Sequence, residues 1–145
     1  MVTSPAAHIA PKAPLRVLVI DAHPAVGRGL VRLVGIMPGL QVCGLAARAQ
    51  DGLEQAALLQ PDVALVDADL PNDAVVRTIR QLRTCLPTTR VVALGLYPDR
   101  RAAMLAAGAH AFALKDAGFD ALRAAIVAGA NPPMASVPMP RSSAS

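Results

Sequence analysis

The stretch Leu15-Arg16-Val17-Leu18-Val19-Ile20-Asp21 is an apolar run that ends on a carboxylate, and three further runs share its form. They are Val63-Ala64-Leu65-Val66 before Asp67, Val91-Val92-Ala93-Leu94 before Gly95, and Ala111-Phe112-Ala113-Leu114 before Lys115. Parallel strands buried on both faces read as continuous apolar runs, and open α/β sheets bind ligands beyond the carboxyl ends of such strands. The runs therefore predict a parallel sheet that brings two carboxylates and one ammonium to a single crevice.

Helical segments alternate with these runs along the chain. We expect strands near 15–21, 41–46, 62–67, 90–95 and 110–114, and helices near 24–37, 51–60, 73–85, 99–108 and 119–129. Repeated strand–helix units with short connections favour right-handed crossovers and helices on both faces of the sheet. The pattern predicts an α/β fold of five strands and five helices.

Individual residues mark the ends of the expected helices. Pro24 suits a first helical position, where its missing N–H costs nothing. Asp51 and Glu54 have the spacing of a capping box, which would open the second helix at Asp51. Pro61 would stop that helix, and Gly108 would close the fourth one.

The composition indicates one folded domain. Of the 145 residues, 54% are apolar, which excludes a disordered chain. No apolar run approaches the roughly 18 residues that span a bilayer, and the N-terminus lacks the pattern of an export signal, so we expect a cytoplasmic protein without membrane contact. We expect one folded domain at 15–130, a flexible arm at 1–14, and a disordered tail or interdomain linker at 131–145.

The net charge of +4 does not by itself indicate a nucleic-acid-binding protein. Only three aromatic residues are present, too few for a base-stacking platform, so we expect no direct nucleic acid binding by this chain. Cys43 and Cys85 lack the spacing of metal ligands, and we expect both to be buried small hydrophobic residues.

The charged residues at the ends of the runs are those that phosphoryl chemistry requires. A carboxylate can coordinate Mg²⁺, or it can attack phosphorus to form an acyl phosphate. The transferred group then needs nearby positive charge. We therefore expect Asp67 to be the nucleophile, Asp21 to be a metal ligand and Lys115 to bind the phosphoryl group. The alternative is that the aspartates only cap the helices that follow them.

At these residues the chain resembles the receiver domains of bacterial response regulators, particularly the NarL/FixJ type. The matching stretches are Val17-Leu18-Val19-Ile20-Asp21-Ala22-His23-Pro24, Gly29-Leu30, Pro61-Asp62-Val63-Ala64-Leu65-Val66-Asp67, Leu70-Pro71 and Leu114-Lys115-Asp116-Ala117. The resemblance covers about residues 16–129. It implies a CheY-like, flavodoxin-like doubly wound sheet with strand order 2-1-3-4-5.

The resemblance also implies a role in a two-component phosphorelay. A sensor histidine kinase, or another signalling protein, would phosphorylate Asp67, and the chain would be a signalling module rather than an enzyme. Output, and a homodimer contact, would use the face formed by residues 99–108, 110–114 and 119–129. Regulators of this type carry a C-terminal helix-turn-helix domain, so we expect either a stand-alone receiver or a chain cut inside its linker.

Two positions depart from the family pattern, and two further residues bear on the same site. Ala22 stands where the family usually has a second acidic residue that binds Mg²⁺, so we expect weak metal binding. Gly95 stands where a Thr or Ser hydroxyl usually contacts the phosphoryl group, and Phe112 occupies the aromatic position of the switch. Asp69 follows the acceptor by two residues, and it is either a further metal ligand, through its backbone or side chain, or a solvated loop residue.

These departures leave other readings open. The chain could be a pseudo-receiver that works as a protein-interaction module without phosphorylation. The sequence Asp67-Ala68-Asp69 also resembles the opening motif of haloacid-dehalogenase-like phosphatases, although that motif normally lies on a first strand. Asp21-Ala22-His23 approaches a cobalamin-binding pattern, but the glycine that should follow is one residue late.

Overall fold

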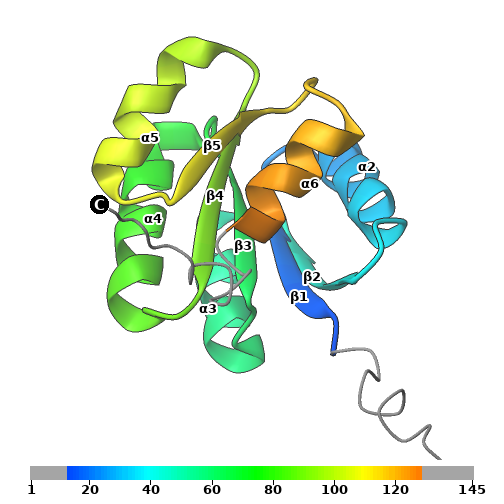
Figure 1. Cartoon of the computed structure of the whole chain (residues 1–145). Helices are drawn as coiled ribbons and strands as arrows, with labels where there is room; N and C mark the ends of the chain where they lie inside the picture. Colours follow the sequence, from blue (N-terminus) through cyan, green and yellow to red (C-terminus); the bar gives the residue numbers. More distant parts are fainter. Residues whose placement is uncertain (1–12, 129–145) are drawn as a thin grey trace, which may run out of the picture.

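A parallel sheet of five strands forms the centre of the protein, as the apolar runs predict. The computed structural model describes residues 13–128. The strands are β1 (Leu15–Ile20), β2 (Leu40–Ala46), β3 (Val63–Asp67), β4 (Arg90–Gly95) and β5 (Ala111–Leu114), and every neighbouring pair is parallel. Their order across the sheet is β2-β1-β3-β4-β5 (Figure 1). This is the doubly wound, flavodoxin-like arrangement expected from the sequence.

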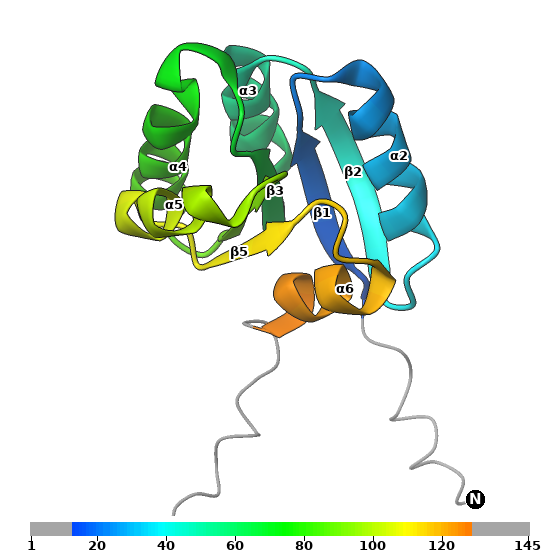
Figure 2. The same ribbon diagram turned by 90° about the horizontal axis from the view of Figure 1, so that it is seen from above.

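Helices cover both faces of the sheet. The α-helices are α2 (Pro24–Gly35), α3 (Ala49–Leu59), α4 (Ala74–Cys85), α5 (Arg101–Ala107) and α6 (Phe119–Val127), and short 3₁₀ turns η1 (Pro71–Asp73) and η2 (Pro98–Arg100) precede α4 and α5. Figures 1 and 2 show α2 and α6 on one side of the sheet and α3, α4 and α5 on the other. None of the helices between residues 13 and 128 has the length and apolar character that a bilayer crossing requires.

Alternation along the strands divides the core into two layers. Val17 and Val19 pack with residues of α2 and α6, whereas Leu18 and Ile20 pack with residues of α3, α4 and α5. All four side chains are fully buried. The central strands β3 and β4 show no polar alternation because helices cover both of their faces. The two apolar layers fix the sheet, and with it the positions of the residues that follow each strand.

The helix ends differ from the predictions at α3. The helix begins at Ala49, so Asp51 lies in its first turn and the predicted capping box is wrong: no side chain caps this helix. Asp51 instead accepts a hydrogen bond from Arg48 Nε at 3.3 Å. Pro24 takes the first position of α2 as predicted, and Gly108 ends α5 in a left-handed conformation with φ of 118°.

Two further predictions are corrected by the structure. The expected helix at 99–108 begins at Arg101, because the chain after Tyr97 first forms the 3₁₀ turn η2. Cys43 is half-buried and Cys85 is exposed, since Cys85 lies at the solvent side of the last turn of α4. The predicted arm at 1–14 and tail at 131–145 lie almost entirely outside the described residues, and only residues 13 and 14 of the arm are described.

Candidate functional site

The ends of three strands place the predicted site residues side by side. β1 and β3 are direct neighbours with Ile20 opposite Val66, so the residues that follow, Asp21 and Asp67, lie at the same edge of the sheet. Lys115 comes directly after β5, and its N–H donates to the carbonyl of Gly95 at 2.8 Å. The crevice predicted from the apolar runs is thus formed by residues 21, 67 and 115.

Lys115 bridges the two carboxylates. Its Nζ lies 3.0 Å from Asp67 Oδ1, to which it donates a hydrogen bond, and 3.0 Å from Asp21 Oδ2, with which it forms an ion pair. The side chain of Lys115 is only 6% exposed, and those of both aspartates are almost fully buried. One buried ammonium therefore faces two buried carboxylates, which leaves the three groups with an excess of negative charge.

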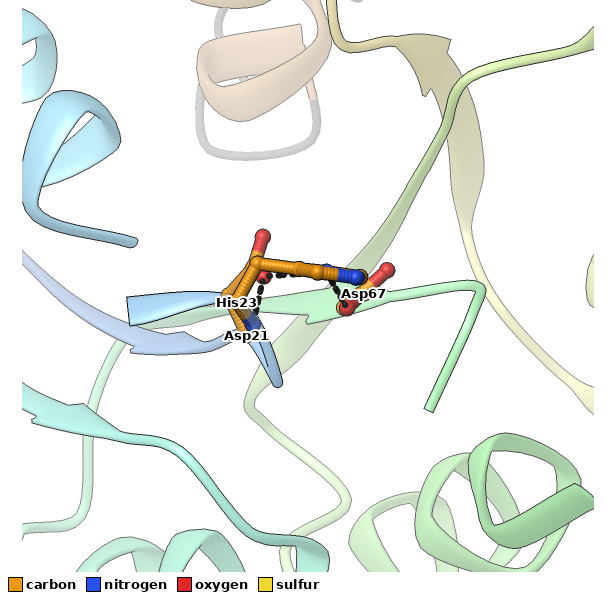
Figure 3. A group of neighbouring side chains, drawn as sticks. All are labelled: Asp21, His23 and Asp67. Carbon is orange, nitrogen blue, oxygen red and sulfur yellow. Dashed lines mark hydrogen bonds and ion pairs between the residues drawn. The ribbon is translucent and has the colours of Figure 1, made fainter. Parts of the chain in front are cut away.

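The other oxygen of each carboxylate points away from the lysine. Asp67 Oδ2 accepts the N–H of Ala22 at 3.1 Å, and Asp21 Oδ1 accepts the N–H of His23 at 2.8 Å. The imidazole Nδ1 of His23 lies 3.5 Å from Asp21 Oδ1 and 3.6 Å from Asp67 Oδ2 (Figure 3). Each carboxylate thus presents one oxygen to Lys115 and one to His23.

These contacts keep Asp67 charged. Burial alone would raise the pKa of Asp67, but the N–H of Asp69, the ammonium of Lys115 and the N–H of Ala22 all favour the carboxylate, so its pKa lies below the usual value. For Lys115, burial opposes the charged form, yet the hydrogen bonds and charges of Asp67 and Asp21 raise its pKa above the usual value. At neutral pH the site holds an ionised Asp67 carboxylate beside a protonated lysine.

Asp69 contributes its backbone to the site. Its N–H donates to Asp67 Oδ1 at 2.8 Å, while the residue itself is exposed. No hydrogen bond or ion pair of its carboxylate is found among residues 13–128. That Asp69 binds a metal stays a prediction. In the structure its backbone N–H donates to the Asp67 carboxylate and so helps to orient it.

The residues expected to form the switch contact each other. Phe112 is 8% exposed, and its ring lies over Gly95. A β-carbon on Gly95 would lie 2.9 Å from Phe112 Cζ, closer than real β-carbons approach a neighbour. A side chain at position 95 would therefore require the Phe112 ring or its surroundings to shift.

Arg100 is a residue that the sequence did not single out. Its Nη2 donates to the carbonyl of Ala68, the residue after Asp67, at 2.9 Å. Its Nε is buried and has no hydrogen-bond partner within the described part of the chain. Arg100 lies in the turn η2, which the sequence predicts to be the start of a helix. Its partner Ala68 lies 32 positions earlier in the chain, and no sequence motif links the two residues. The guanidinium fastens the loop after Asp67 to the turn after β4.

The donor set of this crevice fits a divalent cation. Asp21, His23 and Asp67 each offer one ligand atom, and these atoms all lie within 4.8 Å of one another. Carboxylate oxygens are ligands that Mg²⁺ accepts, and the buried excess of negative charge favours a cation. Ala22 adds no ligand from its side chain, so the carboxylate count is two rather than three.

Comparison with known proteins identifies relatives in sequence and in structure. The family described as the response regulator receiver domain matches residues 17–127. The response regulator GacA of Pseudomonas viridiflava is 35% identical over 117 residues, which cover 77% of this chain and 53% of that protein. The DNA-binding transcriptional activator DevR/DosR of Mycobacterium tuberculosis is 33% identical over 119 residues, 80% of this chain and 55% of that protein. The chain spans about half the length of these relatives.

Solved structures show the same architecture. The signal receiver domain of the putative response regulator NarL from Mycobacterium tuberculosis has a TM-score of 0.70 and 30% identity, covering 79% of this chain and 98% of that one. A response regulator receiver domain from Methanospirillum hungatei, described as CheY-like, has a TM-score of 0.66 at 22% identity, covering 76% and 88%, and it supports the fold alone.

Proposed function

The chain belongs to the response regulator receiver domain family of two-component signalling, and from this premise we propose that Asp67 accepts a phosphoryl group from a sensor histidine kinase. The observation that carries the proposal is Lys115 Nζ, which lies 3.0 Å from both Asp67 and Asp21. This contact joins residues that are 48 positions apart or more along the chain. It gives the acceptor an ionised carboxylate and a fixed partner for the anion that it receives.

The transfer is a substitution at phosphorus. A carboxylate oxygen of Asp67 attacks the phosphorus of a phosphohistidine and forms the O–P bond of an acyl phosphate. The P–N bond breaks, its electron pair returns to the imidazole of the donor, and that nitrogen takes a proton from solvent. The lowered pKa of Asp67 keeps its oxygen unprotonated and available as the nucleophile.

Lys115 has two parts in this proposal. Before transfer it balances the charge of Asp67, and after transfer its ammonium can hold an oxygen of the phosphoryl group. A divalent cation held by Asp21 and Asp67 would supply further positive charge toward the equatorial oxygens. The N–H groups of Ala22 and Asp69 keep the Asp67 carboxylate oriented throughout.

We infer that the chain is a phosphoryl acceptor and not an enzyme that releases product in each cycle. The family membership argues against the phosphatase and cobalamin alternatives, because each of them requires a different family. In addition, the phosphatase reading needs Asp69 as acid or base, and that residue is exposed and offers the site its backbone N–H.

The proposed output surface is the face formed by α5, β5 and α6. Ala102, Ala103 and Ala106 on α5 are exposed, and Leu105 is 37% exposed, whereas Ala109, which follows α5, is buried in the core. The exposed side of α5 therefore carries small and apolar side chains. A second copy of the chain or another signalling protein is the partner that we propose for this face.

Phosphorylation can be tested without a kinase. The 145-residue chain is incubated with acetyl phosphate and Mg²⁺, and its intact mass is measured over time. We expect the mass of one phosphoryl group to be added to the wild type and to Asp69→Asn, but not to Asp67→Asn. A phosphoryl group that persists on Asp67→Asn, or that is absent from the wild type, contradicts the proposal.

A second candidate function is a receiver that works without phosphorylation. Two observations favour it: Ala22 removes a carboxylate ligand, and the Phe112 ring is already buried against Gly95. In this case the α5, β5 and α6 face would bind its partner equally well before and after treatment with acetyl phosphate. A partner bound by the wild type and by Asp67→Asn with equal affinity would distinguish this function from the first.

A further inference from the structure

A pocket of about 260 Å³ lies between α3 and α4, which pack side by side on one face of the sheet (Figure 2). Both helices run back from the carboxyl ends of their strands, and the pocket includes the residues at which they end, so it lies at the end of the sheet away from Asp67. Its lining is mostly apolar, and we call it the α3–α4 groove. The residues that form it are Leu53, Ala57, Leu82 and Leu86, with the amides of Gln60 and Gln81.

The size of this groove suits a side chain of a partner. Pockets that hold drug-sized molecules usually enclose about 300–1,000 Å³, whereas an apolar cavity of about 150 Å³ holds a benzene ring. The α3–α4 groove therefore has room for an aromatic or a branched aliphatic side chain. Leu58, which follows Ala57 in α3, is 83% exposed, more than any other large apolar side chain between residues 13 and 128. It extends the apolar surface that a partner would cover.

Positive charge lies beside the groove on α4. The sequence of this helix contains three arginines and no acidic residue. Arg77 precedes the groove residue Gln81 by four positions, so both lie on the same side of α4, and Arg80 follows Arg77 by three positions. Arg77 and Arg80 are exposed, and neither forms an ion pair within residues 13–128. This side of α4 therefore favours a partner of opposite charge.

The acidic residues of α3 do not neutralise these arginines. Asp51 is paired with Arg48 at 3.3 Å, and Glu54 accepts a hydrogen bond from Gln50 Nε2 at 3.1 Å. Each of these carboxylates is engaged by a residue three or four positions earlier in the chain. Carboxylates of a partner would therefore meet Arg77 without displacing an existing ion pair.

We propose that the α3–α4 groove binds an acidic, amphipathic helix of a partner protein, with one apolar side chain in the pocket and carboxylates opposite Arg77 and Arg80. An amphipathic helix laid into an apolar groove is a recurring mode of recognition, and charges at the edge of such a contact select the partner. The inference goes beyond the proposed function, because this surface is separate from Asp67 and from the face formed by α5, β5 and α6.

The test uses a fluorescent probe peptide. The chain contains no tryptophan, so a tryptophan in the peptide reports its own burial. The probe is a synthetic helix of about 14 residues, or about four turns, built from glutamate, alanine and leucine with one central tryptophan. When the 145-residue chain is added, the fluorescence should shift to the blue and saturate, and the affinity should fall as salt is added. A probe that shows no saturable shift overturns the proposal.

A second peptide tests the sign of the charge. It carries lysine in place of every glutamate and is otherwise identical to the first. We expect it not to bind, because Arg77 and Arg80 repel it. A lysine peptide that binds as tightly as the acidic peptide shows that the groove selects apolar side chains alone, which contradicts the proposal.

Variants of the chain test the two arginines. Arg77→Gln combined with Arg80→Gln should weaken binding of the acidic peptide about fivefold, as expected for the loss of two exposed ion pairs. The control is Arg28→Gln combined with Arg32→Gln, which removes the same charge from exposed positions of α2 on the other side of the sheet. The control should bind as the wild type does. Equal losses of affinity in the two double variants overturn the proposal.

A further variant tests the pocket. Ala57 lines the groove and is exposed, so Ala57→Phe adds a ring to the pocket without entering the core. We expect this variant to lose the blue shift of the probe while its urea denaturation stays close to that of the wild type. An unchanged blue shift in Ala57→Phe means that the tryptophan does not enter the pocket, and the proposal is then wrong.

Two other occupants of the groove give distinct results. If a second copy of the chain covers it, sedimentation equilibrium without peptide shows a dimer that Ala57→Phe abolishes. If the arginines bind polyanions in general, a short DNA duplex displaces the peptide. Either result overturns the assignment of an acidic helix. None of these outcomes affects the intact-mass experiment, which tests Asp67 separately.

Discussion

The ring of Phe112 lies so close to Gly95 that a β-carbon on residue 95 would approach Cζ to 2.9 Å. In the family pattern, a hydroxyl side chain at this position and an aromatic residue on the last strand work together. Here Gly95 offers no hydroxyl, and the Phe112 ring occupies the space where a side chain at residue 95 would lie. Burial of Phe112 against residue 95 therefore does not require a hydroxyl at that position.

Restoring a side chain at residue 95 should disturb Phe112. We expect Gly95→Thr to cost about 1–3 kcal/mol of unfolding free energy by overpacking, measured by urea denaturation. In the Phe112→Ala background the same change should cost much less, because the added atoms enter the space that the ring leaves. Costs that add without coupling in this double-mutant cycle would show that the two side chains do not compete.

The sequence predicts most of this fold because its strands are buried on both faces. Runs such as Val63–Val66 have no other stable position than the middle of a covered sheet, and the residues after them must meet at one edge. The contacts of Arg100 and the direction of the His23 imidazole could not be predicted. Both depend on the backbone angles of short connecting segments. In addition, Arg100 contacts a backbone carbonyl, and because every residue has one, the sequence does not indicate which carbonyl it will be.

Removing the lysine should leave two buried carboxylates facing each other. We expect Lys115→Met to lower the free energy of unfolding at pH 7 by on the order of 3 kcal/mol, as for other broken buried ion pairs. The loss should shrink as the pH is lowered, since proton uptake by one carboxylate relieves the repulsion. Arg77→Met, a change of an exposed cation on α4, is the control and should alter stability little. An equal effect of both changes contradicts the role of Lys115.

The ionisation of Asp67 predicts how stability depends on acid. Its folded pKa is lower than its ordinary value of 3.8, so the unfolded chain takes up a proton first as the pH falls. The stabilising contribution is present above pH 3.8 and is lost as the pH falls through the folded pKa. We expect the wild type to lose more stability than Asp67→Asn in this window, measured by urea denaturation at a series of pH values.

The exposed Asp116 provides the control for this titration. Asp116→Asn should follow the wild type through the acid window, because its side chain lies at the surface and takes no part in the buried site. If the unfolding free energy of Asp67→Asn depends on pH as that of the wild type does, the hydrogen bonds of Asp67 do not lower its pKa.

Arg100 should restrain the loop after Asp67. Without its hydrogen bond to the Ala68 carbonyl, the segment of residues 68–70 should open more often. We expect Arg100→Ala to speed amide hydrogen exchange in that segment several-fold, while the neighbouring exposed change Arg101→Ala leaves it unchanged. Unaltered exchange in Arg100→Ala would mean that the guanidinium is not needed to hold the loop.

The most direct test of the central claim, that Asp67 is the phosphoacceptor held by Lys115, is ¹⁹F spectroscopy with beryllofluoride, which mimics a phosphoryl group on a carboxylate. With Mg²⁺ present, the wild type should give bound fluoride signals, Asp67→Asn should give none, and Lys115→Met should give weaker ones. Bound signals that remain in Asp67→Asn, or a wild type that binds no beryllofluoride at saturating Mg²⁺, would contradict the claim.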